Sequence, residues 1–390
     1  MPPGRTIVKQ DTRVVRAGRD RGHYRGSVNP PVYHVSTVLY DSLAEFLAVS
    51  KPVPGKLVYG RWGTPTSFTL ADALAELEGG AGCALFPSGA AAIAASLLAF
   101  VEPGDHVLIP DNVYGSTRRI CDHMLPRFQI KTTYYDPTIG AGIASLMTPR
   151  TKIVYVEAPG SMTLEMQDVP AIAVAGASAG AITMMDNTWA TPLFFKPFDH
   201  GVDVSIQAGT KYIVGHSDAM LGSVTANQKA WSAIDRASYL LGQCVGPDDA
   251  YLAQRGLRTL AVRLARHQES ALKVAEWLTR QPAIERVLYP ALPSDSGHAL
   301  WRRDFTGASG LLSIVLKPVS AKKLEAMVDG LKLFGIGASW GGFESLVCPS
   351  RAVRTATFLD PARPILRFHI GLESVDDLIA DLRAGLDRLK

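Results

Sequence analysis

Two residues 25 positions apart in this chain could carry out covalent chemistry together. Asp186 ends the apolar run Met184-Met185, and Lys211 lies further on in Ala208-Gly209-Thr210-Lys211-Tyr212. A lysine amine can bind an aldehyde covalently, and a carboxylate can keep a pyridine nitrogen protonated so that the ring accepts electrons. The pair therefore predicts pyridoxal 5'-phosphate as cofactor, with Lys211 as the point of attachment and Asp186 as partner of the ring nitrogen.

A second interpretation of this pair stays open at this point. Asp186 follows residues too apolar to be exposed, and a buried carboxylate without a cationic partner is costly. Lys211 could itself be that partner, in an internal salt bridge without any cofactor.

A phosphate-binding turn is predicted at Pro87-Ser88-Gly89-Ala90-Ala91-Ala92, where a strand leads into a helix of small residues. Small residues allow the backbone to approach an anion, and the first turn of a helix has free N–H groups. Such turns are common, but Thr210, next to the lysine, adds a hydroxyl. The turn and Thr210 together therefore predict a phosphate-binding site.

Two further residues could position the ligands. Tyr114 lies in a loop after a predicted strand, where an aromatic ring can stack on a cofactor or simply pack on the surface. Arg367 lies within the strand Leu366-Arg367-Phe368-His369, and its guanidinium could bind a substrate carboxylate or form an ordinary ion pair.

The elements that must position these residues alternate between apolar strands and helices from about 61 to 245. Near-continuous apolar strands separated by helices predict an α/β fold with a mostly parallel sheet covered on both faces. Ligands bind at the carboxyl ends of the strands in such sheets. Five residues directly follow predicted strands, namely Ser88, Tyr114, Glu157, Asp186 and Lys211.

Three parts of the chain are predicted. Residues 1–60, rich in Pro, Gly, Tyr and Arg, resemble an extended arm with little core, which we expect to pack on another subunit. A large cofactor-binding domain spans 61–256, and a smaller C-terminal α/β domain spans 257–390. Between them we expect a long helix from Pro247 to Arg280 with a break at Gly256, and at the end a helix capped by Ser374.

Composition excludes several classes of protein. The chain has 390 residues, 47% of them hydrophobic and 19% charged, and its net charge of +4 is diffuse, so we expect neither a nucleic acid nor a membrane as partner. No apolar run approaches the ~20 residues of a membrane span, and no signal peptide is predicted. The four scattered cysteines indicate reduced thiols in the cytoplasm and no metal site.

Taken together, these motifs resemble the Cys/Met-metabolism family of pyridoxal-phosphate enzymes, which have the aspartate-aminotransferase fold (fold type I). The resemblance extends from Tyr59-Gly60-Arg61-Trp62 to Arg367. The bacterial cystathionine β-lyase branch is the most similar, because of Glu157-Ala158-Pro159-Gly160-Ser161, Ser205-Ile206-Gln207-Ala208 and Ser339-Trp340-Gly341-Gly342. Relatives that act at the γ carbon usually have leucine at the position of Trp340.

The resemblance implies a role for each site residue. Lys211, Asp186 and Tyr114 are implied as catalytic and cofactor-binding, and Gly89, Ala90 and Thr210 as phosphate ligands. Arg367, Ser339 and Trp340 are implied as substrate-binding. Tyr59 and Arg61 would reach the phosphate of a neighbouring subunit, which requires a homodimer and, in this family, usually a dimer of dimers. Ala208 and Ala338 depart from the family by lacking a serine and a tyrosine, respectively.

The implied activity is carbon–sulfur β-elimination from a sulfur amino acid. L-cystathionine would give homocysteine, pyruvate and ammonia for methionine biosynthesis, and cystine or cysteine would also react. A γ-acting sister enzyme is one alternative. A non-catalytic cofactor-binding regulator is another, against which the sequence has no basic helix-turn-helix before residue 60 and an intact lysine and aspartate.

Overall fold

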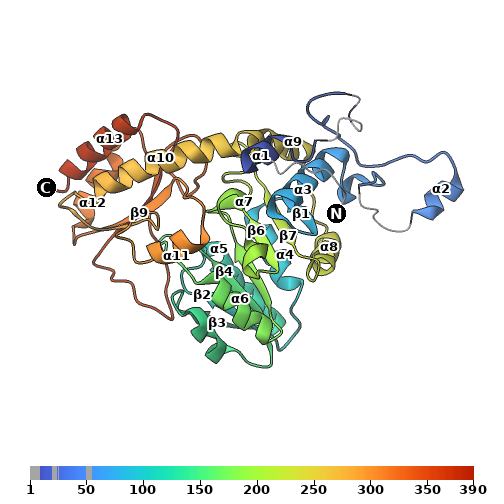
Figure 1. Cartoon of the computed structure of the whole chain (residues 1–390), viewed down its shortest axis with the longest axis horizontal. Coiled ribbons are helices and arrows are strands. Elements are labelled where there is room, and N and C mark those ends of the chain that lie inside the picture. The colour runs from blue at the N-terminus through green and yellow to red at the C-terminus, as the bar shows by residue number, and fades with distance from the viewer. Residues whose placement is uncertain (1–8, 20–23, 25, 50–54) are drawn as a thin grey trace.

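The computed structural model describes residues 9–19, 24, 26–49 and 55–390. Figure 1 shows a large α/β part, a smaller α/β part joined to it by the long helix α10, and an N-terminal arm that projects from the body. Most of the bulk of the molecule thus surrounds two sheets.

Seven strands form the sheet of the large part, in the spatial order β1-β7-β6-β5-β4-β2-β3. All are parallel except β7, which runs antiparallel to both of its neighbours. The strands are β1 (Gly82–Phe86), β2 (His106–Pro110), β3 (Lys131–Tyr135), β4 (Thr151–Glu157), β5 (Ile182–Asp186), β6 (Val204–Gln207) and β7 (Gly222–Ala226).

Helices cover both faces of this sheet. Val107 and Ile109 of β2 face a cluster with α4 and α8, whereas Leu108 between them faces a cluster with α6. This double burial explains why the strands read as continuous apolar runs. The helices of this part are α3 (Pro65–Glu78), α4 (Gly89–Leu98), α5 (Gly115–Arg119), α6 (Val169–Ser178), α7 (Thr191–Phe194), α8 (Trp231–Leu240) and α9 (Pro247–Arg258).

The smaller part has a five-stranded sheet in the order β10-β11-β12-β9-β8, in which β10 and β11 are parallel and the other pairs antiparallel. Its hydrophobic residues and those of the large part, such as Phe368 and Met185, belong to one continuous cluster. The elements are α10 (Leu260–Leu278), β8 (Ile284–Leu288), α11 (His298–Asp304), β9 (Leu311–Leu316), α12 (Ala321–Asp329), β10 (Gly335–Ile336), β11 (Leu346–Pro349), β12 (Ile365–His369) and α13 (Val375–Asp387).

The long helix predicted from Pro247 is broken at Thr259 and not at Gly256, so that prediction was wrong. Gly256 lies within α9, where a Cβ would be 2.1 Å from the carbonyl oxygen of Val214. Glycine therefore serves the close approach of α9 to the loop after Lys211. The predicted cap is wrong in detail, because Ser374 occupies the N-cap position of α13 without a side-chain hydrogen bond.

The predicted domain boundary after residue 256 stays a proposal. It falls in the last turn of α9, which packs against α3 of the large part, whereas α10 packs against α13 and β9 of the smaller part. We retain 61–256 and 257–390 as proposed domains because the change of packing partner occurs between these two helices.

The described part of the arm is not wholly extended, contrary to the expectation of little helix. It contains α1 (Gln10–Arg16) and α2 (Leu43–Ala48), and the backbone carbonyls of Val14 and Ala17 accept hydrogen bonds from Arg258. Residues 1–8, 20–23, 25 and 50–54 of the predicted arm lie outside the described residues. Among the helices described, none is both long and apolar enough to cross a bilayer.

Candidate active site

One pocket at the carboxyl ends of the parallel strands collects most of the predicted site residues. It is closed on one side by the C-terminal part, which contributes Trp340 and Arg367. Eight of the eleven predicted residues line it, namely Gly89, Ala90, Tyr114, Asp186, Thr210, Lys211, Trp340 and Arg367. Ser339 does not line the pocket itself but accepts a hydrogen bond from Lys211, which does. Tyr59 and Arg61 are not part of the lining.

Lys211 follows β6 and points across to the C-terminal part. Its Nζ donates a hydrogen bond of 2.6 Å to Ser339 Oγ and lies 5.5 Å from the centre of the Trp340 ring. Burial lowers the pKa of the Lys211 amine to about 8, and the charge of Arg367 adds to this effect while Asp186 opposes it. The neutral amine, which covalent attachment to an aldehyde requires, is therefore more accessible near neutral pH than in an ordinary lysine.

Asp186 lies at the end of β5 with its Oδ1 held by Thr188, whose backbone N–H and hydroxyl donate hydrogen bonds of 3.0 and 2.5 Å. Burial raises the pKa of Asp186, and the bonds from Thr188 partly offset that rise. In the described chain no ion pair joins Asp186 to Lys211, so the salt-bridge interpretation is wrong. The hydrogen bonds all reach Oδ1, which leaves Oδ2 to meet a cationic ring nitrogen.

Two residues beside Asp186 were given no role by the sequence. Thr188 was overlooked, although an aspartate side chain commonly accepts a hydrogen bond from the backbone N–H two residues further on. Glu157 lies beside Asp186 in the β4–β5 register, and its Oε2 accepts a hydrogen bond of 2.8 Å from the backbone N–H of Tyr114. Burial, followed by the nearby Asp186, raises the pKa of Glu157 well above its usual range.

The predicted phosphate-binding turn begins α4. Ser88 is the N-cap and accepts a hydrogen bond from Ala91 N at 3.1 Å. A Cβ on Gly89 would lie 2.6 Å from the Cβ of Ala208, so glycine permits the helix to begin against the loop after β6. The Thr210 hydroxyl donates to the Leu221 carbonyl at 3.1 Å, a bond it would exchange on donating to a phosphate. These phosphate roles stay predictions.

Arg367 lies on β12 with 7% of its surface exposed and has no acidic side chain within ion-pair distance among the described residues. Its Nη2 donates to the carbonyl oxygens of Ala338 at 2.7 Å and Ser339 at 3.4 Å. Burial lowers its pKa. A buried guanidinium without a counter-charge suits a ligand carboxylate, and the ordinary ion pair considered for Arg367 is absent.

Tyr59 and Arg61 lie apart from the pocket of their own chain. Tyr59 is partly exposed, and Arg61 donates to the Tyr239 carbonyl at 3.1 Å with its guanidinium 5.1 Å from the Tyr239 ring. Their role toward a neighbouring subunit therefore stays a prediction. No group of three or more His, Cys, Asp or Glu side chains within the described ranges could hold a metal ion.

The residues present fit pyridoxal phosphate. Asp186 and Glu157 are two buried carboxylates at one end, which suit a cationic ring nitrogen, and Lys211 supplies a largely desolvated amine. The start of α4 offers free N–H groups for a phosphate. The pocket thus has the acidic, nucleophilic and anion-binding groups that this cofactor needs.

Comparison with known proteins places the chain in a class. Residues 11–387 match the model of the Cys/Met metabolism PLP-dependent enzymes, and the chain belongs to that family. Pyridoxal phosphate is therefore its cofactor. The fold is that of the type I pyridoxal-phosphate enzymes.

Individual relatives differ in their activities. A cystathionine beta-lyase of Escherichia coli is 49% identical, covering 98% of this chain and 99% of the relative. An L-alanine/L-glutamate racemase of Wolbachia pipientis is 41% identical, covering 98% of each chain. The crystal structure of cystathionine gamma synthase from Xanthomonas oryzae, in complex with aminoacrylate and cysteine, has a TM-score of 0.89 at 34% identity and covers 98% and 99% of the two chains.

Proposed function

We propose that the protein is a carbon–sulfur β-lyase that cleaves L-cystathionine into homocysteine, pyruvate and ammonia. The observation that carries the proposal is the buried Arg367 without a counter-charge, in the same pocket as Lys211 and Asp186. An amino acid would place its carboxylate on Arg367 and its α carbon beside Lys211. The 49% identity to a cystathionine beta-lyase supports this substrate.

Pyridoxal phosphate, when bound, supplies a sink for the electron pair left on the α carbon. Asp186 keeps the ring nitrogen protonated through its free Oδ2, while Thr188 holds the other oxygen. Arg367 fixes the substrate carboxylate and so the direction of the Cα–H bond.

Lys211 carries the proton. Its neutral amine removes the Cα proton, and the resulting ammonium gives a proton to the sulfur as the Cβ–S bond breaks. Ser339 accepts from Lys211 Nζ at 2.6 Å and so directs it. One water molecule completes the reaction, which yields pyruvate and ammonia in addition to homocysteine. The released homocysteine would serve methionine biosynthesis, and cystine and cysteine would be cleaved in the same way.

The deciding experiment is incubation of the loaded enzyme with L-cystathionine and assay of both keto acids. Pyruvate supports the proposal, whereas 2-oxobutyrate would indicate a γ-acting sister. L-alanine and L-glutamate are tested for racemisation, since one relative is named for that activity. Lys211→Ala is the control for each assay, and no turnover on any substrate would favour a non-catalytic protein.

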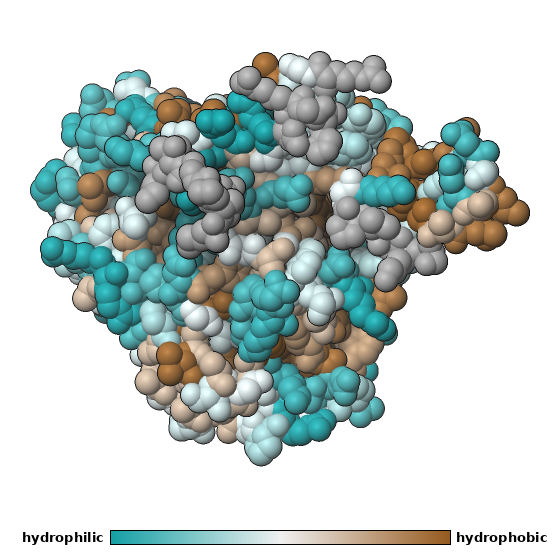
Figure 2. Space-filling view, turned by 45° about the vertical axis from the view of Figure 1, so that its right-hand side comes forward, coloured by the Kyte–Doolittle hydropathy of each residue, from teal (hydrophilic) through white to brown (hydrophobic). Residues whose placement is uncertain are grey.

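We also propose a homo-oligomer, a dimer or a dimer of dimers. Large apolar side chains are exposed in and next to α2 of the projecting arm, where Figure 2 shows hydrophobic surface; among them are Leu39, Leu43, Phe46 and Leu47. Such a patch suits burial against a second copy of the chain.

If Arg61 serves the neighbour's phosphate, mixing Arg61→Ala and Lys211→Ala chains should recover up to about a quarter of wild-type turnover, because half of the dimers would be hybrids with one intact site. Absence of recovery after verified subunit exchange would contradict this role.

We place the enzyme in the cytoplasm. Its four cysteines are free thiols, as is usual in a reducing compartment. Cell fractionation followed by detection of the protein tests this proposal.

A further inference from the structure

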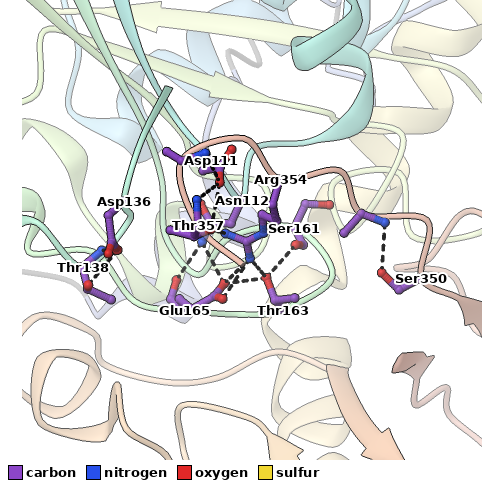
Figure 3. A network of polar contacts seen from close by, with 12 residues as sticks. Asp111, Asn112, Asp136, Thr138, Ser161, Thr163, Glu165, Ser350, Arg354 and Thr357 are labelled. Atoms are coloured by element: carbon purple, nitrogen blue, oxygen red, sulfur yellow. Dashed lines mark hydrogen bonds and ion pairs between the residues drawn. The ribbon is translucent and has the colours of Figure 1, made fainter. Parts of the chain in front are cut away.

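The connection between β11 and β12 is far longer than an antiparallel pair needs. The register of the two strands ends at Pro349 and Leu366, and residues 350–364 are here named the strap. Ser350 and Pro364 still bond to the C-terminal sheet, and the strap leaves the sheet between them. Hairpin loops usually have 2–5 residues, and longer loops in compact domains are commonly functional. Figure 3 shows the strap lying against loops of the large part.

The first anchor of the strap is Asp111, which directly follows β2 and is 1% exposed. Its carboxylate accepts hydrogen bonds from three successive backbone N–H groups, those of Thr355 at 2.9 Å, Ala356 at 2.9 Å and Thr357 at 2.7 Å. Arg118 adds a bond of 2.6 Å. Although burial raises the pKa of Asp111, the bonds from the strap and Arg118 bring it down to about 2.

The second anchor is Arg354, whose side chain is 4% exposed. Its Nη2 donates to both carboxylate oxygens of Glu165, at 2.8 and 3.0 Å, and to Thr163 Oγ1 at 2.5 Å. In Figure 3 its guanidinium points away from the strap toward these two residues. Asn112, next to Asp111, donates to Glu165 at 3.1 Å and so links the two anchors.

Both anchors hold loops that line the pocket. Asp111 lies three residues before Tyr114, and Thr163 belongs to the loop 159–164. The Ser161 backbone N–H donates to the Asn112 carbonyl at 2.8 Å, so these loops are also tied to each other. At its other end the strap leads directly into β12, which carries Arg367.

We propose that Asp111 and Arg354 are positioning residues, which use the strap to set Arg367 at a fixed distance from Tyr114 and the loop 159–164. Arg367 and the pocket loops lie on different parts of the molecule, and the strap joins them by charge-assisted hydrogen bonds. Even a small misplacement of the bound substrate lowers the rate of turnover strongly. The link from this geometry to turnover rests on the proposed function.

The chain offers a matched control. Arg303 of α11 binds Asp168 at the start of α6 at 2.7 Å, so this pair also joins the C-terminal and large parts. Neither residue lines the pocket. Arg303→Gln therefore removes an ion pair between the two parts without touching the strap.

The test compares Arg354→Gln with Arg303→Gln in the cofactor-loaded enzyme by hydrogen–deuterium exchange and steady-state kinetics. Arg354→Gln should speed exchange both in 350–364 and in 159–166, and raise KM for cystathionine about tenfold or more at unchanged cofactor content. Arg303→Gln should change KM less than about twofold. Asp111→Asn should in addition alter the circular dichroism of the bound cofactor, because Tyr114 would shift.

Two results would overturn the proposal. If exchange becomes faster only in the strap and KM is unchanged, the strap is a surface connection without a positioning role. If Arg354→Gln and Arg303→Gln have equal effects, the strap acts only as one of several contacts between the two parts. If Asp111→Asn does not fold, exchange and KM of Arg354→Gln and of the milder variant Thr357→Val decide whether the strap positions Arg367. Should the wild type not cleave cystathionine, the proposed function fails, while exchange in 159–166 still tests the strap.

Discussion

The two ends of the pocket carry opposite charges, and each lacks a partner of the opposite charge. At one end the pKa values of Asp186 and Glu157 are raised by burial, and at the other those of Lys211 and Arg367 are lowered by burial. Among the described residues neither end pairs with an opposite charge at contact distance. The pocket is thus electrostatically incomplete, and a cationic ring at one end and a carboxylate at the other would complete it.

The ends also differ in how they are held in place. Asp186 and Glu157 lie on adjacent parallel strands, whose register sets their separation. Arg367, in contrast, comes from the C-terminal sheet and reaches the pocket only because that part docks, with the strap as one of its connections. We infer that Asp186 and Glu157 serve the resident cofactor, whereas Arg367 serves a substrate that binds and leaves in each turnover.

The largest effect is expected for Lys211→Ala, which removes the reactive amine of the pocket. Loss of the amine that moves the proton should lower turnover by about 10⁴-fold or more. Pyruvate release from cystathionine measures it. Residual turnover near the wild-type level would place the catalytic amine elsewhere.

Asp186→Asn tests the acidic end. The amide keeps the size of the side chain but does not hold the ring nitrogen protonated, so kcat should fall about 10²- to 10³-fold even at saturating substrate. Glu157→Gln is the comparison, and its effect should be smaller because that carboxylate is bonded to Tyr114 N. Equal losses in the two variants would show that the carboxylates act as one unit.

Arg367→Ala tests the basic end. Loss of a buried charge-assisted contact costs about 2–5 kcal/mol, which corresponds to roughly 30- to 5000-fold in kcat/KM. Most of this should appear in KM, since the carboxylate is bound in the ground state and the transition state alike. Cofactor content, measured by absorbance, should not change. An unaltered KM would make Arg367 structural.

The smallest effect concerns the pH at which the apoenzyme takes up its cofactor. The reactive form of Lys211 is the neutral amine, and its pKa is lowered to about 8, chiefly by burial. The rate of reconstitution should therefore rise about tenfold per pH unit below pH 8 and level off above it. A rate that keeps rising up to pH 10 would show that Lys211 is not desolvated in the apoenzyme.

Much of the parallel sheet could be predicted from the sequence, because apolar runs of four to seven residues and the turns after them are local signals. The strands predicted before Ser88, Glu157 and Asp186 are β1, β4 and β5, which end at Phe86, Glu157 and Asp186. The antiparallel β7 and the short β10 and β11 were missed. Their existence depends on partners far along the chain and not on a pattern of their own.

The sequence alone determined which groups the site contains, since Lys211, Asp186, Tyr114 and Arg367 are recognisable by their types and by the strands next to them. Only the tertiary structure decided which of these groups are free of ion pairs, and that Lys211 meets Ser339 128 positions away. It also decided that Asp111 is held by Thr355, 244 positions further on. Burial and charge pairing arise from contacts between distant segments, so no local pattern contains them.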